Sequence, residues 1–577
     1  MNKKRWIQLA ALTLILSSAE ATKAVFEDAA PLVPANKIDR LVFAKLSELD
    51  IQPVLCSDSV FVRRVYLDII GKVPTADQAK AFIVDPDVKN KRSNLIDQLM
   101  GQKGFLDYRA MKWSDTLRIK AEFPINLWPN AAQAYHHWVR ASIAENKPYD
   151  QFAREMLTAS GSNFRVGEVN FYRAIQNKTP EGIATAAALT FMGARTEKWT
   201  EEELQNLTVF FSQVGYKPTS EWKEEVVFWD PLQITKAKGN SAPGNAKVTT
   251  VIAPNTNQAP VVIESPNTAT LPDGTTVKLT ANRDPREVFA DWLITPENPW
   301  FARCAVNRVW AWLLGRGIIH EADDIRDDNP ASNPELLNWL TKEFIAHNYD
   351  MNHLYRLILN SRTYQLSSVS NVENPKAAAQ FAAYPLRRLE AEVIIDAIND
   401  ITGTTDLYTS AIPEPFTYIP KDQSAVSIAD GSITSSFLSL FGRSARATGM
   451  ANERNNQITP PQWRHLLNSG HIQEKIERGP NMKKLLAKRK NPEELIDSLY
   501  LTILSRYPTE AEIEAVMSYG NIGVSKQPPK QKKKTKLSNA QKKKKAAQAK
   551  AISRAQLNDW IDITWSLFNN PEFIYRH

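Results

Sequence analysis

The stretch that decides the fold runs from residue 61 to residue 78 and reads FVRRVYLDIIGKVPTADQ. Its first ten residues carry apolar side chains at helical spacing, and the helix they predict ends at Gly71, with Pro74 beyond it. Thr75 then resembles the N-cap of a following helix. Short amphipathic helices separated by such stop signals predict a mainly α-helical protein.

The same period continues on both sides of this stretch. We predict further helices over residues 38–49, 95–100, 108–117, 131–143, 152–157 and 180–192, leading into a run over 199–214. Together they predict an entirely helical N-terminal domain over residues 35–220.

The pattern changes after this domain. Short β-branched runs at 248–252, 261–263 and 275–279 lie among Gly, Pro, Asn and Thr clusters, and Pro272-Asp273-Gly274 predicts a turn. We therefore expect a small β-rich insertion or linker over residues 221–282.

Helices resume at Asp284, a predicted N-cap followed by Pro285 at the first helical position. Predicted helices follow at 288–294, 302–314, 334–347, 354–360, 386–401, 461–467, 493–505, 510–518 and 558–568, with a loop-like region over 403–436. Residues 283–523 together with 554–577 are expected to form a second helical domain. A chain of 577 residues can bury two or three separate cores.

The N-terminus has the three parts of a secretory signal peptide. Lys3, Lys4 and Arg5 precede an apolar stretch over residues 9–16, and Ala19-Glu20-Ala21 offers a cleavage site. We predict that residues 1–24 direct export to the periplasm or cell surface; a retained N-terminal anchor is the alternative. No later segment is long and apolar enough to predict a transmembrane helix.

The net charge of +8 comes from the ends of the chain. Residues 526–550 hold eleven lysines and no acidic residue, and without them and residues 1–24 the net charge is −6. A mildly acidic body argues against a nucleic-acid partner. The Lys-rich segment, residues 524–553, predicts disorder or a fraying helix. Lys526 to Lys550 either contact an anionic surface or are simply solvated.

Motifs for chemistry are few. The sequence has no G-x-S-x-G, Walker loop, H-E-x-x-H or C-x-x-C. Cys56 and Cys304 are expected to be buried free thiols, although export would permit a disulfide. His136 and His137 are adjacent on a predicted helix and point about 100° apart, so they cannot chelate one ion as an i, i+4 pair would.

Two groups of charged residues are candidate sites. Asp323, Asp324 and Asp327, with Asp328, offer oxygens to Ca²⁺, or they cap a helix and pair with Arg326 or Arg316. Guanidinium groups suit either an anionic ligand or buried ion pairs between helices, and these stretches hold Arg308, Arg362, Arg387, Arg388, Arg443 and Arg446, with Glu390, Glu392, Asp396 and Glu453 near them. The ligand-binding candidates are Arg308, Arg362, Arg388, Glu392 and Arg443.

Particular stretches resemble a known domain pair. Residues 38–40 (IDR), 62–68 (VRRVYLD), 71–75 (GKVPT) and 147–152 (KPYDQF) are similar to the Planctomycete Specific Cytochrome-type domain of unknown function. The second half resembles its companion, the Planctomycete Specific Domain, at 298–303 (NPWFAR), 306–310 (VNRVW), 314–317 (LGRG), 323–326 (DDIR), 333–337 (NPELL), 361–365 (SRTYQ), 387–392 (RRLEAE) and 569–573 (NNPEF).

One departure from this resemblance matters for cofactors. Members of the family carry a C-x-x-C-H haem-attachment motif before a W-T motif, but residues 191–200 read FMGARTEKWT. Residues 447–453 (ATGMANE) also lack a cysteine that the resemblance would suggest. Without thiols and an imidazole, covalent haem has no attachment point, so we expect no haem and no other cofactor, Ca²⁺ being the one ion considered.

The function expected from these observations is recognition. We predict a non-catalytic envelope protein that binds a partner protein or polysaccharide. The alternative is an enzyme or accessory factor acting on envelope or sulfated carbohydrate, as the family's setting beside sulfatase-like partners suggests. One solvent-reachable cleft lined by Arg308, Arg362, Arg388 and Glu392 would favour the enzyme, and separately paired charges would favour the binding protein.

Overall fold

The computed structural model describes residues 25–28, 31–232, 268–369, 374, 376–520, 522 and 539–577. The predicted signal peptide, the predicted strands at 248–252 and 261–263, and the first part of the Lys-rich segment lie outside these residues. Within them helices dominate and strands are short, so the mainly α-helical fold is confirmed.

The N-terminal helices begin and end close to the predicted positions. Helix α4 (Asp58–Ile70) ends at Gly71, which has a φ of 64° and lies so close to the Tyr108 ring that a side chain would collide with it. Thr75 caps the next helix with a capping box. The other elements here are α3 (Lys37–Glu48), α5 (Ala76–Ile83), α6 (Lys91–Met100), α7 (Lys103–Thr116), α8 (Pro129–Ala144), α9 (Tyr149–Thr158), α10 (Asn170–Arg173), α11 (Pro180–Ala187), the π-helix η1 (Ala188–Met192), η2 (Thr196–Lys198), α12 (Glu201–Thr208) and η3 (Val209–Phe211).

A three-stranded sheet shows that the prediction of an entirely helical N-terminal domain was wrong. Strand β5 (Glu225–Trp229) lies between β3 (Gly161–Ser162) and β4 (Val214–Pro218), antiparallel to both. The run predicted as a helix to residue 214 ends at Phe211 because the chain then pairs with β5. A short apolar run fits a helix or a strand equally well, and its partner strand decides between them.

The predicted turn at residues 272–274 joins β6 (Thr268–Thr270) to β7 (Thr276–Lys278) in a hairpin. A second two-stranded pair, β1 (Glu27–Asp28) with β2 (Leu55–Cys56), lies near the N-terminus. Cys56 therefore lies in a strand, and Cys304 lies in a helix. Both thiols are free and buried, as predicted.

The C-terminal half also follows the prediction, with one correction. The helix predicted over 386–401 begins only at Ala391, because Arg387–Arg388 form strand β8, paired with β9 (Tyr575–Arg576). The helices are α13 (Pro285–Leu293), α14 (Phe301–Leu314), α15 (Pro334–Ala346), α16 (Met351–Leu359), η4 (Ala378–Gln380), α17 (Ala391–Thr402), α18 (Ser436–Leu440), η5 (Ala451–Glu453), α19 (Pro460–Asn468), α20 (Gly470–Arg478), α21 (Pro480–Leu486), α22 (Pro492–Ile503), α23 (Glu510–Ser518), α24 (Asn539–Phe568) and α25 (Pro571–Ile574). From Asn539 the Lys-rich segment is helical, which is one of the two states its composition predicted.

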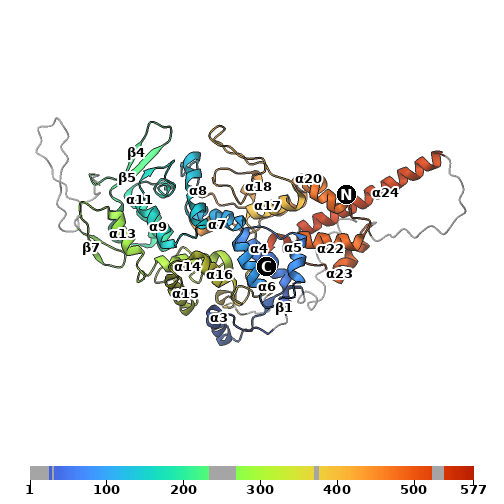
Figure 1. Cartoon of the computed structure of the whole chain (residues 1–577), viewed down its shortest axis with the longest axis horizontal. Coiled ribbons are helices and arrows are strands. Elements are labelled where there is room, and N and C mark those ends of the chain that lie inside the picture. The colour runs from blue at the N-terminus through green and yellow to red at the C-terminus, as the bar shows by residue number, and fades with distance from the viewer. Residues whose placement is uncertain are drawn as a thin grey trace, which may run out of the picture.

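The apolar cores divide the chain at a different place from the predicted domains. One cluster of buried side chains collects mainly residues between 38 and 384, and the other collects mainly residues between 389 and 574. Helices α13 to α16 therefore belong to the core of the N-terminal half; for example, the ring of Phe301 stacks on Tyr149 with centroids 4.9 Å apart. In Figure 1 these helices lie beside α7 and α9, while α20 to α24 lie at the other end of an elongated molecule.

The C-terminal residues return to the N-terminal helices. Arg63 donates a hydrogen bond of 2.9 Å to the carbonyl oxygen of Phe573, and Arg64 donates one of 2.9 Å to that of His577. Figure 1 shows the C-terminus among α4, α5 and α6. No helix in the described part of the chain is long and apolar enough to cross a membrane.

Candidate ligand-binding cleft

Of the predicted arginine candidates, Arg308 and Arg388 are buried, and each binds a different part of the backbone. Arg308 donates to the carbonyl oxygens of Leu189 and Thr190 in η1, at 3.2 and 2.8 Å. Arg388 donates to two other carbonyl oxygens, both at 2.7 Å, those of Phe441 and Asn455. These guanidinium groups therefore hold irregular backbone in place, which satisfies buried carbonyl oxygens.

Arg362, the third candidate, lies in the loop after α16. Its guanidinium donates to Gln365 Oε1 at 3.0 Å, and its backbone N–H donates to the buried carboxylate of Asp39 at 3.0 Å. Its guanidinium therefore binds a different group from those that Arg308 and Arg388 bind.

Glu392 and Arg443 do lie together, in a buried ion network. Glu392 Oε1 accepts from Arg443 Nε at 3.2 Å, and both Glu392 oxygens accept from Arg454, at 2.7 and 3.1 Å. Arg454 and Arg446 also bind Asp115, which comes from α7. Burial alone would raise the pKa of Glu392, but the charges and hydrogen bonds of Arg454 and Arg443 lower it to about 2. Glu392 is fully buried, whereas the Asp115 side chain is 17% exposed, so the network joins α7 to the C-terminal half from the interior outward.

The acidic loop is divided among separate partners. Asp323 accepts from Arg195 at 2.7 Å and from the backbone N–H of Ala451 at 3.0 Å. Asp324 and Asp328 both bind Arg326, whereas Asp327 is exposed. The loop thus shows the predicted pairing with Arg326. Arg195, which follows the π-helix η1, adds a second cation.

A polar cleft on α8 is the candidate site that these predictions missed. Its volume is about 890 Å³, and we call it the α8 cleft. It is lined from α8 by Asn130, Gln133, Ala134, His137, Trp138 and Ala141, from the loop after β3 by Phe164, Arg165, Gly167 and Glu168, and from the β4–β5 turn by Glu221. In Figure 1 the β4–β5 hairpin and α8 stand next to each other.

Close contacts fix the walls of this cleft. A side chain at Gly167 would collide with Trp138 and lie 2.6 Å from the carbonyl oxygen of Ala134, so the loop reaches α8 only because residue 167 is glycine. The Trp138 ring stacks on Phe152 with centroids 4.7 Å apart. Glu224 accepts hydrogen bonds from Ser162 and Thr219, which ties the hairpin to β3.

Exposed aromatic residues extend from one end of the cleft. Trp222 follows Glu221 and is 70% exposed. The Lys223 ammonium lies 5.2 Å from the Trp222 ring centroid and 5.9 Å from that of Trp128, and Trp128 contacts the 49% exposed Phe416 at 5.3 Å. We call Trp128, Trp222 and Phe416 the aromatic rim.

The chemistry of the cleft is that of polar recognition. Amide, imidazole, carboxylate and guanidinium groups offer both donors and acceptors, and the aromatic residues Trp138 and Phe164 also line the cleft. Arg165 and the nearby Lys223 balance Glu168 and Glu221, so the site has little net charge. Of the two histidines weighed from the sequence, His137 lines this cleft and His136 is buried, where desolvation lowers its pKa to about 3.

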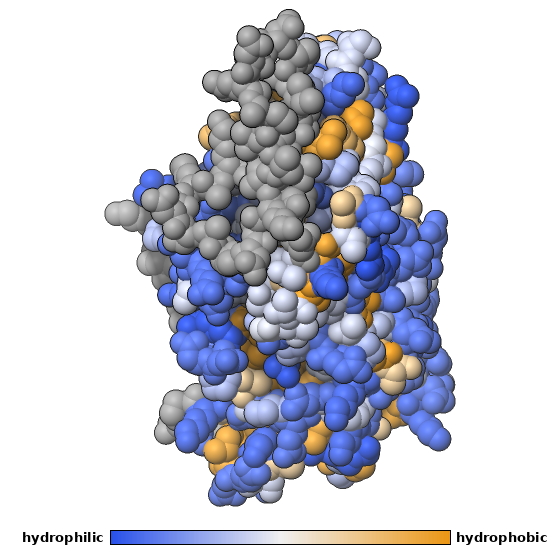
Figure 2. Space-filling model, turned by 90° about the vertical axis from the view of Figure 1, so that its left-hand side faces the viewer, coloured by the Kyte–Doolittle hydropathy of each residue, from blue (hydrophilic) through white to orange (hydrophobic). Residues whose placement is uncertain are grey.

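Figure 2 shows the surface at the end of the molecule formed by α13 and β7. Its described part is mainly hydrophilic, with apolar residues in small, separate patches. Scattered exposed apolar residues of this kind are ordinary for a protein surface.

Comparisons with known proteins identify both halves of the chain. Residues 37–213 match PSCyt2, a protein of unknown function (DUF1549), and residues 285–519 match PSD1, a protein of unknown function (DUF1553). Neither a curated protein nor a solved structure matches the chain. The protein therefore belongs to the family in which a PSCyt2 domain is followed by a PSD1 domain.

Proposed function

We propose that this protein is a non-catalytic envelope protein that binds an uncharged polysaccharide in the α8 cleft. The observation that carries the proposal is the lining of the cleft, where Asn130 and Gln133 lie on the same wall as Trp138. Sugars present hydroxyl groups at their edges and apolar faces between them, so amide groups and aromatic rings together suit them.

The charge balance of the cleft supports an uncharged ligand. A sulfated chain needs an excess of Arg or Lys to replace its counterions. Here Arg165 lies 3.9 Å from Glu221, and Glu168 adds a second carboxylate. A neutral polysaccharide has no charge that the cleft must balance, so it can bind without an excess of Arg or Lys.

The buried arginines also favour binding over catalysis at the predicted motifs. Arg308, Arg388 and Glu392 are engaged by protein groups and less than a tenth exposed. Their contacts with protein groups support a role in the fold, as expected of the binding protein, for which separately paired charges were predicted.

Export completes the proposal. The n-region, apolar stretch and cleavage site within residues 1–24 support secretion, after which the cleft would meet polysaccharide in the periplasm or at the cell surface. Cell fractionation with N-terminal sequencing tests this part. A chain in the envelope fraction that begins near residue 22 is expected, and a cytosolic chain that still begins at Met1 would contradict it.

The binding test is affinity electrophoresis of the purified chain in gels that contain dextran, xylan, laminarin or sulfated carrageenan. We expect at least one neutral polysaccharide to retard the protein, and the double variant Asn130→Ala/Gln133→Ala and the variant Trp222→Ala to abolish the retardation. Gln473→Ala, on an exposed position of α20, is the matched control and should migrate like the wild type. Retardation by carrageenan alone, or by none of the four, would overturn the proposal.

A second candidate function rests on the two carboxylates of the cleft. Glycoside hydrolases use a pair of carboxylates, one as an acid and one as a base or nucleophile. Glu168 and Glu221 come from different walls of the α8 cleft. Release of reducing ends from a polysaccharide that binds, lost in both Glu168→Gln and Glu221→Gln, would establish the enzyme in place of the binding protein.

A further inference from the structure

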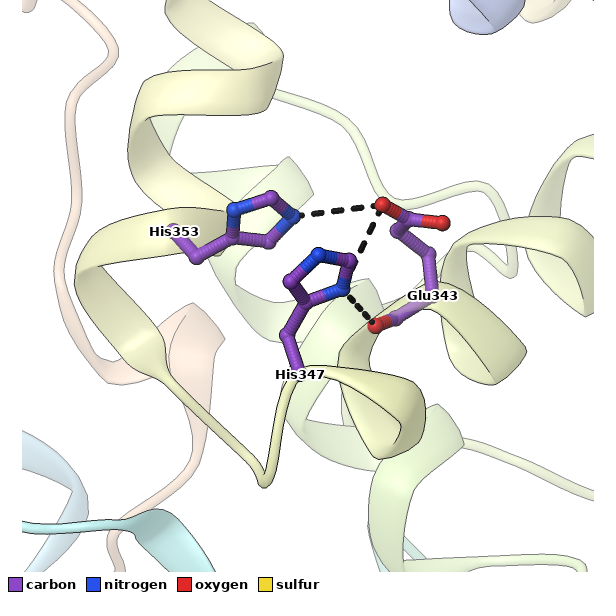
Figure 3. Close-up of side chains that lie close together, drawn as sticks. All are labelled: Glu343, His347 and His353. Atoms are coloured by element: carbon purple, nitrogen blue, oxygen red, sulfur yellow. Dashed lines mark hydrogen bonds and ion pairs between the residues drawn. The ribbon is translucent and has the colours of Figure 1, made fainter.

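Three metal-binding side chains meet at the junction of α15 and α16, away from the α8 cleft. Glu343 and His347 are four residues apart at the end of α15, and His353 lies in the first turn of α16. One potential ligand atom from each lies within 4.8 Å of the others, and within the described residues this is the one such group. Figure 3 shows both imidazoles turned toward the Glu343 side chain.

The turn between the helices holds this arrangement in place. Asn348 and Tyr349 both have positive φ, 54° and 55°, which reverses the chain within a few residues. The Tyr349 ring packs on Phe344 and Phe301, and Asp350 caps α16 by accepting from the backbone N–H of His353 at 3.0 Å. The turn therefore places His353 beside His347, and the two imidazole rings stack with centroids 3.7 Å apart.

Hydrogen bonding prepares the imidazoles as ligands. His347 Nδ1 lies 2.9 Å from the carbonyl oxygen of Glu343, and a hydrogen bond donated there leaves the Nε2 lone pair available. His353 Nε2 lies 3.3 Å from Glu343 Oε1. Two imidazole nitrogens and one carboxylate oxygen thus lie close enough for small rotations to bring them around one ion.

We propose that Glu343, His347 and His353 bind one Zn²⁺ ion. Imidazole with carboxylate suits Zn²⁺, whereas Ca²⁺ needs six to eight oxygen ligands. Three protein ligands leave the fourth tetrahedral position to water, which is the pattern of zinc sites that exchange a ligand. The side chains of Glu343, His353 and His347 are 26%, 29% and 45% exposed, so the ion reaches the site from solvent.

This site differs from the predicted acidic loop in the ion-pair partners of its carboxylate. Asp323, Asp324 and Asp328 are each engaged by an arginine. Glu343 has only the two histidines as ion-pair partners among the described residues, so no arginine or lysine competes with a metal ion for its carboxylate.

Zinc titration tests the proposal on the full chain, prepared without a polyhistidine tag, stripped with a chelator and dialysed. Isothermal titration calorimetry with ZnCl₂ should show one ion per chain. His347→Ala, His353→Ala and Glu343→Gln should each weaken binding at least about tenfold, since even an outer partner of a metal ligand is worth about 10–100-fold. Co²⁺ should give the visible absorption bands of a tetrahedral site, and the histidine variants should lack them.

His471→Gln is the matched control, because His471 also faces a carboxylate, that of Asp406 at 2.8 Å, but belongs to no group of three ligands. Its zinc affinity should equal that of the wild type. Far-ultraviolet circular dichroism of each variant checks that the helices remain. Absence of stoichiometric Zn²⁺ binding, or equal affinity in the wild type and the three ligand variants, would overturn the proposal.

Discussion

Buried arginines form ion pairs and hydrogen bonds throughout this protein. Glu392 shows how much one such buried carboxylate contributes to the free energy of unfolding. Its carboxylate receives Arg443 and Arg454 in a site closed to solvent. Glu392→Gln keeps the shape but removes the carboxylate that pairs with Arg443 and one of the two carboxylates that pair with Arg454, and breaking a buried ion pair costs about 3–5 kcal/mol. We expect a loss of that size in the free energy of unfolding, measured by urea denaturation. Glu477→Gln on the exposed face of α20 is the control, and an equal loss in both would contradict this view.

The same residue sets part of the acid stability. Because the folded-state pKa of Glu392 is about 2, against 4.5 when unfolded, its contribution is present above pH 4.5 and is lost as the pH falls toward 2. The full difference corresponds to about 3 kcal/mol. The free energy of unfolding of the wild type should therefore fall more steeply between pH 4.5 and 2 than that of Glu392→Gln. Parallel curves for the two proteins would show that Glu392 does not titrate in this way.

Residue types alone could predict that the arginines serve either buried ion pairs or a ligand site, and the structure favours the pairs. The sequence did not allow us to predict which acidic residues pair with these arginines. Asp115 lies 339 positions before Arg454, and no local pattern marks it as the second carboxylate of the network. The α8 cleft was hidden for the same reason, since its walls come from three separate segments that carry no motif.

At the scale of elements, the contact between the loop after β3 and α8 depends on Gly167. Gly167→Ala puts a methyl group against Trp138 and the Ala134 carbonyl oxygen, so the loop must move away from the helix. Such overpacking costs about 1–3 kcal/mol. We expect a lower melting temperature and a loss of polysaccharide retardation in the affinity gel. Gly470→Ala is the control, because nothing lies within 4 Å of its added methyl group. A Gly167→Ala variant as stable as Gly470→Ala would show that the loop is not tightly held.

Elements with strong local signals were predicted well. Gly71, Thr75, Asp284 and Pro285 end or begin helices as their residue types indicate. The errors fall where pairing with another strand decides the structure. Residues 214–218 pair with β5, and Arg387–Arg388 pair with β9 from the end of the chain. Glu343 and His347 had helical ligand spacing, but His353 joins them only through the positive-φ turn at Asn348 and Tyr349.

At the scale of the whole molecule, the two matched families and the two apolar cores have different boundaries. The PSD1 match begins at residue 285, yet side chains from 289 to 384 belong to the core built on α3 to α9. Ion pairs also join residues on the two sides of this boundary. Glu390 pairs with Lys112 of α7 as well as with Arg576, and Arg446 and Arg454 pair with Asp115. A domain that folded alone would bury its own apolar face and satisfy its own charges.

This arrangement predicts that the C-terminal half, residues 283–577, does not fold by itself. Without residues 31–282 the apolar faces of α14 and α15 lose their cover, and Glu390, Arg446 and Arg454 lose counter-charges in low-dielectric surroundings. The fragment alone should bind the dye ANS and melt without a cooperative transition, as expected of a chain that keeps helices but lacks a fixed core. Co-expressed with residues 31–282, it should co-purify and regain the cooperative transition, because the missing faces are then supplied in trans. A sharp thermal transition in the isolated fragment would instead mean that the shared core is a contact between two independent domains.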